Sequence, residues 1–226
     1  MDSTYNSLAD RILHQWAKKQ AQGDNSRILI ALAGPPGSGK TTIAHKVAKL
    51  IPASPNGPSI LVISADGFHF PLSTLRSWSN ATEALARRGA PWTFDGDAIV
   101  GMVHSLQKTD QVTVCPTFDH AIKDPVRDGL IVDQSTQICI LEGNYLLSDE
   151  APWGEIAELV DDRWLVQVDS ALARDRVAIR HLEAGIEETL DAAYKRVDGN
   201  DMPNGEYVAA RSKGRYDLLI TSIEEA

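Results

Sequence analysis

The chain has 226 residues and a formal net charge of −9, and 43% of its residues are hydrophobic. This size and composition fit a globular protein with a buried core, so we treat residues 1–226 as a single domain. An acidic chain lacks the basic surface of a general nucleic-acid-binding protein, which argues against that class. No apolar run reaches the roughly 20 residues that cross a bilayer, and residues 1–6 show no signal-peptide pattern. We therefore expect a cytoplasmic protein without a membrane or nucleic-acid partner.

The apolar pattern alternates between strands and helices along the chain. Leu8, Ile12, Leu13 and Trp16 recur at helical spacing and predict a first helix over residues 4–22. Five apolar runs predict buried strands, at residues 28–33, 60–64, 137–142, 164–168 and 217–221. Helical stretches separate them, notably at residues 41–51, 97–108, 171–184 and 187–197. This alternation predicts an α/β fold with a parallel sheet that is covered on both faces.

Residues 112–133 interrupt the alternation. Two short extended runs, 112–118 and 129–132, flank a polar loop that contains proline. Such a pattern predicts a β-hairpin that stands outside the main sheet. The two cysteines, Cys115 and Cys139, lie in strand-like apolar runs, and we expect both to be buried free thiols.

The most specific motif has the pattern G-x-x-x-x-G-K-[ST]. It lies between the first predicted strand and the start of the next predicted helix, which is the context that this pattern requires. It consists of Gly34, Pro35, Pro36, Gly37, Ser38, Gly39, Lys40 and Thr41. Glycines let backbone N–H groups converge on phosphate oxygens, and the helix start, which includes Thr42, adds its dipole. Lys40 can reach the β- and γ-phosphates, and the Thr41 hydroxyl can ligate Mg²⁺. A plain turn is the alternative, but a chance match has a probability of only about one in two hundred.

Two acidic residues end predicted strands. Glu142 ends the strand 137–142, and Asp66 follows the strand 60–64 in the run Asp66-Gly67-Phe68-His69. Carboxyl ends of parallel strands face the ligand crevice of an open sheet. We expect Glu142 to hold Mg²⁺ directly or through water, Asp66 to accept or orient the proton of an attacking hydroxyl, and His69 to bind the acceptor. Each has a structural alternative, because buried strands often end in an acid and Asp-Gly is common in turns.

Five blocks of sequence carry a resemblance to a known family. They are the phosphate loop, Asp66-Gly67-Phe68-His69, Arg88-Gly89-Ala90-Pro91-Trp92-Thr93-Phe94-Asp95, Pro116-Thr117-Phe118-Asp119 and Glu142-Gly143-Asn144-Tyr145-Leu146-Leu147. In this order they resemble the phosphoribulokinase/uridine kinase family, which includes bacterial-type pantothenate kinase and nucleoside-kinase-like relatives. The resemblance spans residues 28–208. It implies a P-loop NTPase three-layer sandwich with strand order 2-3-1-4-5, ATP and Mg²⁺ as cofactors, and a small-molecule substrate.

The resemblance also implies an arginine-bearing lid over ATP, within residues 174–200. Arg174, Arg176 and Arg180 lie in the predicted helix 171–184, where the family carries such arginines. Arg176 and Arg180 are four residues apart and share a face, so we assign them to transition-state stabilisation and Arg174 to nucleotide binding. A solvated helix without a catalytic part is the alternative. We expect residues 200–204 to form a capped helix start after the lid.

Departures from the family leave the acceptor open. Uridine kinases carry an acid that holds ribose hydroxyls where this chain has Gly89, and a tyrosine where it has Phe118. Arg87 and Arg88 suit a carboxylate or phosphate on the substrate. We expect a pantothenate-, nucleoside- or sugar-like acceptor, with an anionic one as an option. Its candidate contacts are His69, Arg88, Asp95, Phe118, Asp119 and Lys123. The oligomeric state stays open, with a homodimer as one option.

Two other classes of function stay open. A regulatory NTPase or switch would use the same phosphate loop, but the chain has no Asn-Lys-x-Asp motif for reading guanine. A catalytically silent binding module would keep the fold without the chemistry, and the presence of Lys40, Thr41, Asp66 and Glu142 disfavours it. We therefore predict a small-molecule kinase, and acceptor-dependent turnover of ATP would distinguish it from a switch.

Overall fold

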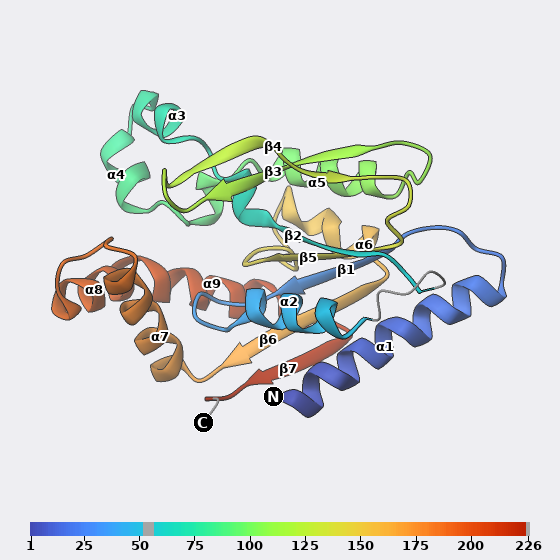
Figure 1. Ribbon diagram of the computed structural model, residues 1–226. Helices are drawn as coiled ribbons and strands as arrows, with labels where there is room; N and C mark the ends of the chain where they lie inside the picture. The colour runs from blue at the N-terminus through green and yellow to red at the C-terminus, as the bar shows by residue number, and fades with distance from the viewer. Residues whose placement is uncertain (52–56, 225–226) are drawn as a thin grey trace.

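The structure is a computed structural model that describes residues 1–51 and 57–224 (Figure 1). Its main sheet has five parallel strands in the spatial order β2-β5-β1-β6-β7. The strands are β1 (Ile28–Ala33), β2 (Ile60–Ser64), β5 (Ile138–Gly143), β6 (Asp162–Val168) and β7 (Leu218–Ser222). Counted along the chain, this order is 2-3-1-4-5, which confirms the predicted α/β class and strand order.

Helices cover both faces of the sheet because side chains alternate between the faces along each strand. In β1, Ile30 belongs to a core shared with α1 (Asp2–Ala21) and α2 (Lys40–Leu50). Its neighbour Ala31 belongs to the core on the opposite face. The helices in that core are α5 (Gly96–Leu106), α6 (Ile156–Leu159) and α9 (Met202–Arg211). All six residues of β1 are consequently buried, as expected of a parallel strand between two helical layers.

A smaller helical unit, the lid, projects beyond the carboxyl ends of the strands (Figure 1). It consists of α7 (Ser170–Glu183), α8 (Leu190–Arg196) and the π-helical turn η4 (Val197–Asp201). The predicted helices 171–184 and 187–197 are thus confirmed, with small shifts in their bounds. The helix expected to start within residues 200–204 is confirmed, because α9 begins at Met202. The expected cap is wrong, because η4 runs directly into α9 and no side chain caps that junction.

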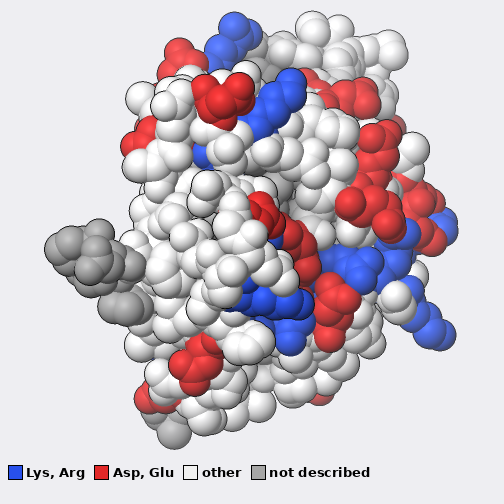
Figure 2. Space-filling view, turned by 90° about the vertical axis from the view of Figure 1, so that its right-hand side faces the viewer, with Lys and Arg blue, Asp and Glu red and all other residues white. Residues whose placement is uncertain are grey.

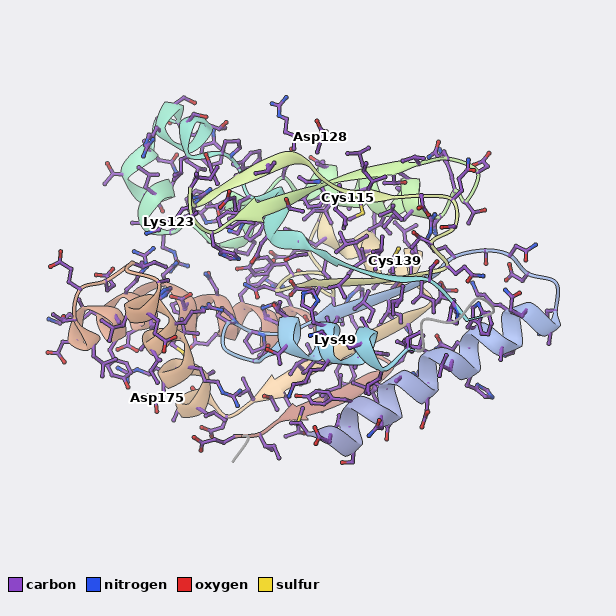
Figure 3. All side chains as sticks on the ribbon, viewed as in Figure 1. Lys49, Cys115, Lys123, Asp128, Cys139 and Asp175 are labelled. Carbon is purple, nitrogen blue, oxygen red and sulfur yellow. The ribbon has the colours of Figure 1, made fainter. Side chains whose placement is uncertain are left out.

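The predicted hairpin forms a separate antiparallel sheet of β3 (Thr113–Asp119) and β4 (Asp124–Val132). The polar loop is shorter than predicted, since β4 already pairs with β3 at Asp124. Pro125 is tolerated within β4 because most of this strand is an exposed edge, where a missing backbone donor costs little. Figure 3 shows Lys123 at the hairpin tip, so the tip lies at the same end of the molecule as the lid.

Charged side chains of both signs share the surface. Figure 2 shows the face at the amino ends of the strands, where Lys and Arg lie among Asp and Glu without forming a continuous basic band. The pairs Arg11–Asp162 and Lys19–Asp161, at 2.6 Å and 2.9 Å, join α1 to the start of β6 and the residue before it. Within the described part of the chain, we find no helix whose length and apolar character would let it cross a membrane.

Candidate active site

The phosphate loop, residues 34–41, joins the carboxyl end of β1 to the first turn of α2. Gly37 and Gly39 have φ angles of 77° and 79°, in the left-handed region that favours glycine. A Cβ atom on Gly37 would lie 2.5 Å from the carbonyl oxygen of Ala173 in α7, so space also demands glycine there. The Ser38 hydroxyl is fully buried and finds no hydrogen-bond partner among the described residues. This tight turn with an orphaned hydroxyl fits a ligand that brings its own oxygen acceptors.

Lys40, the first residue of α2, lies among charged groups from three other elements. Burial lowers the pKa of its ammonium group, whereas the carboxylates of Glu142 and Asp66 raise that pKa. Arg180 of α7 lowers the pKa of Lys40 further. The structure therefore gathers the predicted lysine, both predicted acids and one lid arginine around the phosphate loop.

Glu142, near the end of β5, has the position expected of a metal-linked acid. Its side chain is 2% exposed, and it accepts a hydrogen bond from the Thr41 hydroxyl at 3.0 Å. Burial raises the pKa of Glu142, Lys40 opposes this shift, and the negative charge of Asp66 adds to it. Hydroxyl and carboxylate oxygens are the kind of ligand that Mg²⁺ takes. The two predicted metal ligands thus lie in direct contact.

Asp66 lies in the 3₁₀ turn η1 (Ala65–Phe68), directly after β2. The Ser64 hydroxyl caps this turn by accepting a hydrogen bond from the Asp66 N–H at 3.3 Å. The hairpin packs closely on the next residue, since a Cβ atom on Gly67 would lie 2.3 Å from the carbonyl oxygen of Pro116. Asp66 is therefore fixed at the sheet edge by its cap on one side and by the hairpin on the other.

His69 is enclosed by aromatic rings and by the backbone of the η1 turn. Its Nδ1 lies 2.8 Å from the carbonyl oxygen of Asp66. The ring centroids of Phe94 and Phe118 lie 3.9 Å and 5.2 Å from its own. Burial lowers the pKa of His69, which favours the neutral ring despite the nearby charge of Asp66. Because Nδ1 must donate to the carbonyl, Nε2 of this neutral ring is left as a hydrogen-bond acceptor.

Arg88, another predicted acceptor residue, lies close to Phe118. Its guanidinium carbon lies 5.6 Å from the Phe118 ring centroid. It also forms a 2.8 Å ion pair with Asp124 of β4. His69, Phe118 and Arg88 therefore form one group, which we call the acceptor cluster.

Three other predicted acceptor residues serve local backbone geometry. Asp95 caps α5 by accepting a hydrogen bond from the Ala98 N–H at 3.0 Å. Asp119 accepts a hydrogen bond from the Ala121 N–H at 2.7 Å at the hairpin tip. Lys123, also at the tip, has a φ angle of 55°. Each of these positions thus has a role in backbone geometry that is independent of a substrate.

The lid arginines divide into two groups. Arg176 donates to the carbonyl oxygens of Gly37 at 3.3 Å and Ile223 at 2.8 Å, so it bridges the phosphate loop and the segment after β7. Arg180, one turn further along α7, is close enough to Lys40 to lower its pKa. Both residues assigned to transition-state stabilisation therefore lie near the phosphate loop.

Arg174, the third lid arginine, contacts residues of the lid itself. It forms two hydrogen bonds with the carboxylate of Asp198, at 2.6 Å and 2.8 Å, and its guanidinium carbon lies 4.2 Å from the ring centroid of Tyr194. Both partners belong to the lid itself. Arg174 therefore ties α7 to α8 and η4.

Two hollows adjoin the site. One, of about 350 Å³, lies beside the first turn of α2, and its lining includes Gly39, Thr42, Ile43, Arg176, Ser222 and Ile223. The other, of about 530 Å³, lies between the segments 90–97 and 150–153 and the start of α9, and Trp92, Asp95 and Tyr207 contribute to its wall. The first hollow adjoins the phosphate loop directly, because Gly39 belongs to both.

Sequence reasoning missed a polar group from the lid. The Asn200 side chain donates to the carbonyl oxygen of Arg88 at 3.0 Å. Its own oxygen is buried and has no hydrogen-bond partner within the described ranges. Residues 200–204 were expected only to start a helix, and no sequence pattern predicted the π turn that brings Asn200 to the acceptor side.

A parallel sheet in this order, with a phosphate loop after β1, a hydroxyl–carboxylate pair beside it and an acid after β2, defines a P-loop kinase. The model of the Phosphoribulokinase / Uridine kinase family matches residues 29–189, well over half of the chain. The chain therefore belongs to this family, which confirms the resemblance seen in its sequence blocks.

Individual proteins are similar to the chain along most of its length. The Schizosaccharomyces pombe protein named "Putative uridine kinase C227.14" is 40% identical over 208 residues, which cover 92% of this chain and 84% of that protein. A solved structure from Silicibacter sp. TM1040, described as a "putative fructose transport system kinase", is 31% identical, with a TM-score of 0.77 over 86% of this chain and 89% of that chain. YFH7 of Saccharomyces cerevisiae, 20% identical, shares the fold with a TM-score of 0.82 over 98% and 99% of the two chains. The protein is an ATP-dependent small-molecule kinase, a phosphotransferase with an alcohol group as acceptor.

Proposed function

We propose that the protein transfers the γ-phosphoryl group of Mg-ATP to a hydroxyl of an uncharged, nucleoside- or sugar-like small molecule. The observation that supports this most is the meeting of Lys40, Glu142 and Asp66 at the carboxyl edge of the sheet. There the two carboxylates raise the pKa of Lys40, and the charges of Lys40 and Asp66 act in opposite directions on the pKa of Glu142. Phosphoryl transfer to an alcohol needs a cation for the phosphates, an acid for the metal and a second acid for the acceptor. These three side chains supply that set.

The phosphate loop holds the triphosphate in this proposal. Backbone N–H groups of residues 34–41 and the start of α2 bind phosphate oxygens, and the orphaned Ser38 hydroxyl donates to one of them. Lys40 binds the β- and γ-phosphates. The hollow of about 350 Å³ beside Thr42 and Arg176 takes the adenine base, because it directly adjoins the phosphate loop.

Thr41 and Glu142 fit a bound Mg²⁺, since their oxygens are already 3.0 Å apart. Among residues 1–51 and 57–224, no group of three His, Cys, Asp or Glu side chains is arranged to hold a metal ion. Phosphate oxygens and water would supply the other ligands, which is usual for Mg²⁺ at phosphate sites. When bound, the ion neutralises charge on the phosphates.

The acceptor hydroxyl loses its proton to Asp66 as its oxygen bonds to the γ-phosphorus. The bond between the γ-phosphorus and the oxygen bridging to the β-phosphate breaks, and ADP leaves with that oxygen. Lys40 and Arg180 stabilise the charge that develops during transfer, and Arg176, whose donors bind Gly37, Ser222 and Ile223, adds its positive charge from beside the phosphate loop. The neutral His69 accepts a hydrogen bond from another acceptor hydroxyl through Nε2 and so orients the substrate.

The contacts of the two acceptor-side arginines favour an uncharged acceptor over an anionic one. Arg88 is already neutralised by its 2.8 Å ion pair with Asp124. The guanidinium of Arg87 donates to the carbonyl oxygen of Gly199 and to the side chain of Asn204. Neither guanidinium is therefore free to form the bidentate pair that a substrate carboxylate or phosphate prefers.

The proposal is tested by measuring ADP release with Mg-ATP over a panel of acceptors. The panel contains nucleosides, nicotinamide riboside, pantothenate, glycerate, sugars and sugar phosphates. Each acceptor is also tested by thermal shift, because a ligand that binds only the folded protein raises its apparent stability. We expect one uncharged polyhydroxy class to stimulate ADP release. ATP hydrolysis at one rate with and without every acceptor would contradict the proposal and favour a regulatory NTPase.

A further inference from the structure

Residues 87–89, here named the acceptor loop, place Arg88 in the acceptor cluster. The hairpin holds one side of this loop through the ion pair between Arg88 and Asp124. The core holds a second side, where the Tyr145 hydroxyl donates to the carbonyl oxygen of Gly89 at 2.5 Å. Gly89 has a φ angle of 106°, so the loop takes a path that most other residues would strain.

The π turn η4 closes a third side of the acceptor loop. Arg87 donates through Nη1 to the carbonyl oxygen of Gly199 at 2.7 Å and through Nη2 to Asn204 Oδ1 at 3.2 Å. The Asn200 side chain donates in return to the carbonyl oxygen of Arg88 at 3.0 Å. Three hydrogen bonds thus join the loop to this region, two of them to η4 and one to the first turn of α9, and one guanidinium makes two of the three.

The buried amides around η4 depend on these bonds. The exposed fractions of Asn200 and Asn204 are 5% and 2%, and buried polar groups are costly without partners. A π turn is itself an uncommon backbone arrangement, which occurs frequently at functional sites. Without the Arg87 guanidinium, the carbonyl oxygen of Gly199 and the Asn204 side chain would each lose a charged donor. The turn and the acceptor loop therefore stabilise each other.

The same π turn is bonded to the lid helix α7. His181 Nε2 lies 3.0 Å from the Asp201 carboxylate, and Arg174 pairs with Asp198. Because α7 also carries Arg176 and Arg180, η4 lies between the loop that faces the acceptor and the helix that faces the phosphates.

We infer that Arg87 is a positioning residue that fixes the acceptor loop relative to the lid arginines, and this inference rests on the proposed function. Two donors of one planar guanidinium hold Gly199 and Asn204 together. A lysine has a single nitrogen to offer and reaches one of the two acceptors well. An alanine reaches neither, so the loop and the lid lose their direct link.

The kinetic test compares Arg87→Ala and Arg87→Lys with Arg127→Ala, a matched arginine that lies exposed in β4. The acceptor is the one that stimulates ADP release in the panel above. We expect Arg87→Ala to lower kcat/KM for this acceptor roughly tenfold or more, while KM for ATP stays within about twofold. Arg87→Lys should fall between alanine and the wild type, and Arg127→Ala should match the wild type. An unchanged kcat/KM for the acceptor in folded Arg87→Ala would overturn the inference, and so would equal losses for both substrates.

Hydrogen–deuterium exchange gives a readout that needs no turnover. In Arg87→Ala, exchange should become faster in both residues 87–95 and residues 197–204, with residues 34–41 unchanged. Arg87→Lys provides the same comparison if the alanine variant fails to fold. Unchanged exchange in either segment would overturn the inference whatever the activity. A wild-type protein that phosphorylates no acceptor would contradict the proposed function alone, because the exchange result is independent of it.

Discussion

The phosphate loop and the acceptor loop belong to one site, but different interactions hold them. The phosphate loop follows a strand whose six residues are all buried, and the backbone angle and close packing of Gly37 fix its path. The acceptor loop instead depends on hydrogen bonds to remote elements, as in the bond from the Arg87 side chain to the carbonyl oxygen of Gly199, 112 residues further along the chain. The comparison teaches that a local glycine pattern determines the backbone path of the phosphate loop, whereas long-range polar contacts shape the acceptor side.

The difference between the two loops bears on how substrate choice varies among kinases of this family. Contacts like those of Arg87 and Arg88 can change without disturbing the glycines that curl around phosphates. Substrate choice can therefore diverge while the phosphate loop stays the same. We expect substitutions in the phosphate loop to affect every acceptor equally and substitutions on the acceptor side to affect acceptors unequally.

The largest expected effect comes from removing the charge of the phosphate loop. Lys40→Ala should lower kcat by about a thousandfold, because the charge that develops on the transferring group loses its nearest cation. The measurement is ADP release with the acceptor saturating. Lys49→Ala, on the exposed side of the same helix, is the matched control and should keep full activity. Substantial turnover by folded Lys40→Ala would refute the role assigned to this lysine.

Asp66→Asn should give the next largest effect, on the acceptor side of the comparison. We expect kcat to fall about a hundredfold or more, since the amide cannot take the proton of the acceptor hydroxyl. The affinity for ATP, measured by equilibrium binding, should change little. Asp128→Asn, an exposed acid of the hairpin, serves as the control. Equal losses in turnover and in ATP affinity would count against a role as base.

Gly37→Ala tests whether the path of the phosphate loop requires glycine at this position. The left-handed φ of 77° and the 2.5 Å approach of the Ala173 carbonyl oxygen should make this variant less stable by roughly 1–3 kcal/mol, with weaker ATP binding. Urea denaturation measures the first effect and ATP titration the second. Gly101→Ala in α5 is the matched control, because its Cβ atom would meet nothing within 4 Å. Gly101→Ala should be neutral or slightly stabilising. A Gly37→Ala variant as stable as the wild type would show that the phosphate loop is more adaptable than its geometry indicates.

Much of the phosphate side was predictable from sequence because its signals are local. The loop motif and the two acids at strand ends follow from short patterns and from the rule that ligands bind at the carboxyl edge, whereas the strand order was implied by the family resemblance. The acceptor side was less predictable, because the partners of Arg87 lie in a π turn and in the first turn of α9, and no sequence period indicates the π turn. The capping role of Asp95 was available from the helix that begins directly after it. The helices α3 (Leu72–Ser77) and α4 (Ala81–Ala86) were missed because six residues are too few to show a helical period.

The smallest expected effect concerns the neutral His69 of the acceptor cluster. Its pKa in the folded protein lies below the ordinary value of 6.5, so the unfolded chain binds more protons between the two values. The stability that depends on this group is therefore present above about pH 6.5 and is lost as the pH falls toward the lower, folded pKa. His69→Gln should lose less stability than the wild type between about pH 8 and about pH 5.5, as measured by the urea midpoint. His14→Gln, at an exposed position of α1, should follow the wild-type curve. Identical pH profiles for wild type and His69→Gln would mean that His69 is not held neutral, and its Nε2 would then be no acceptor for a substrate hydroxyl.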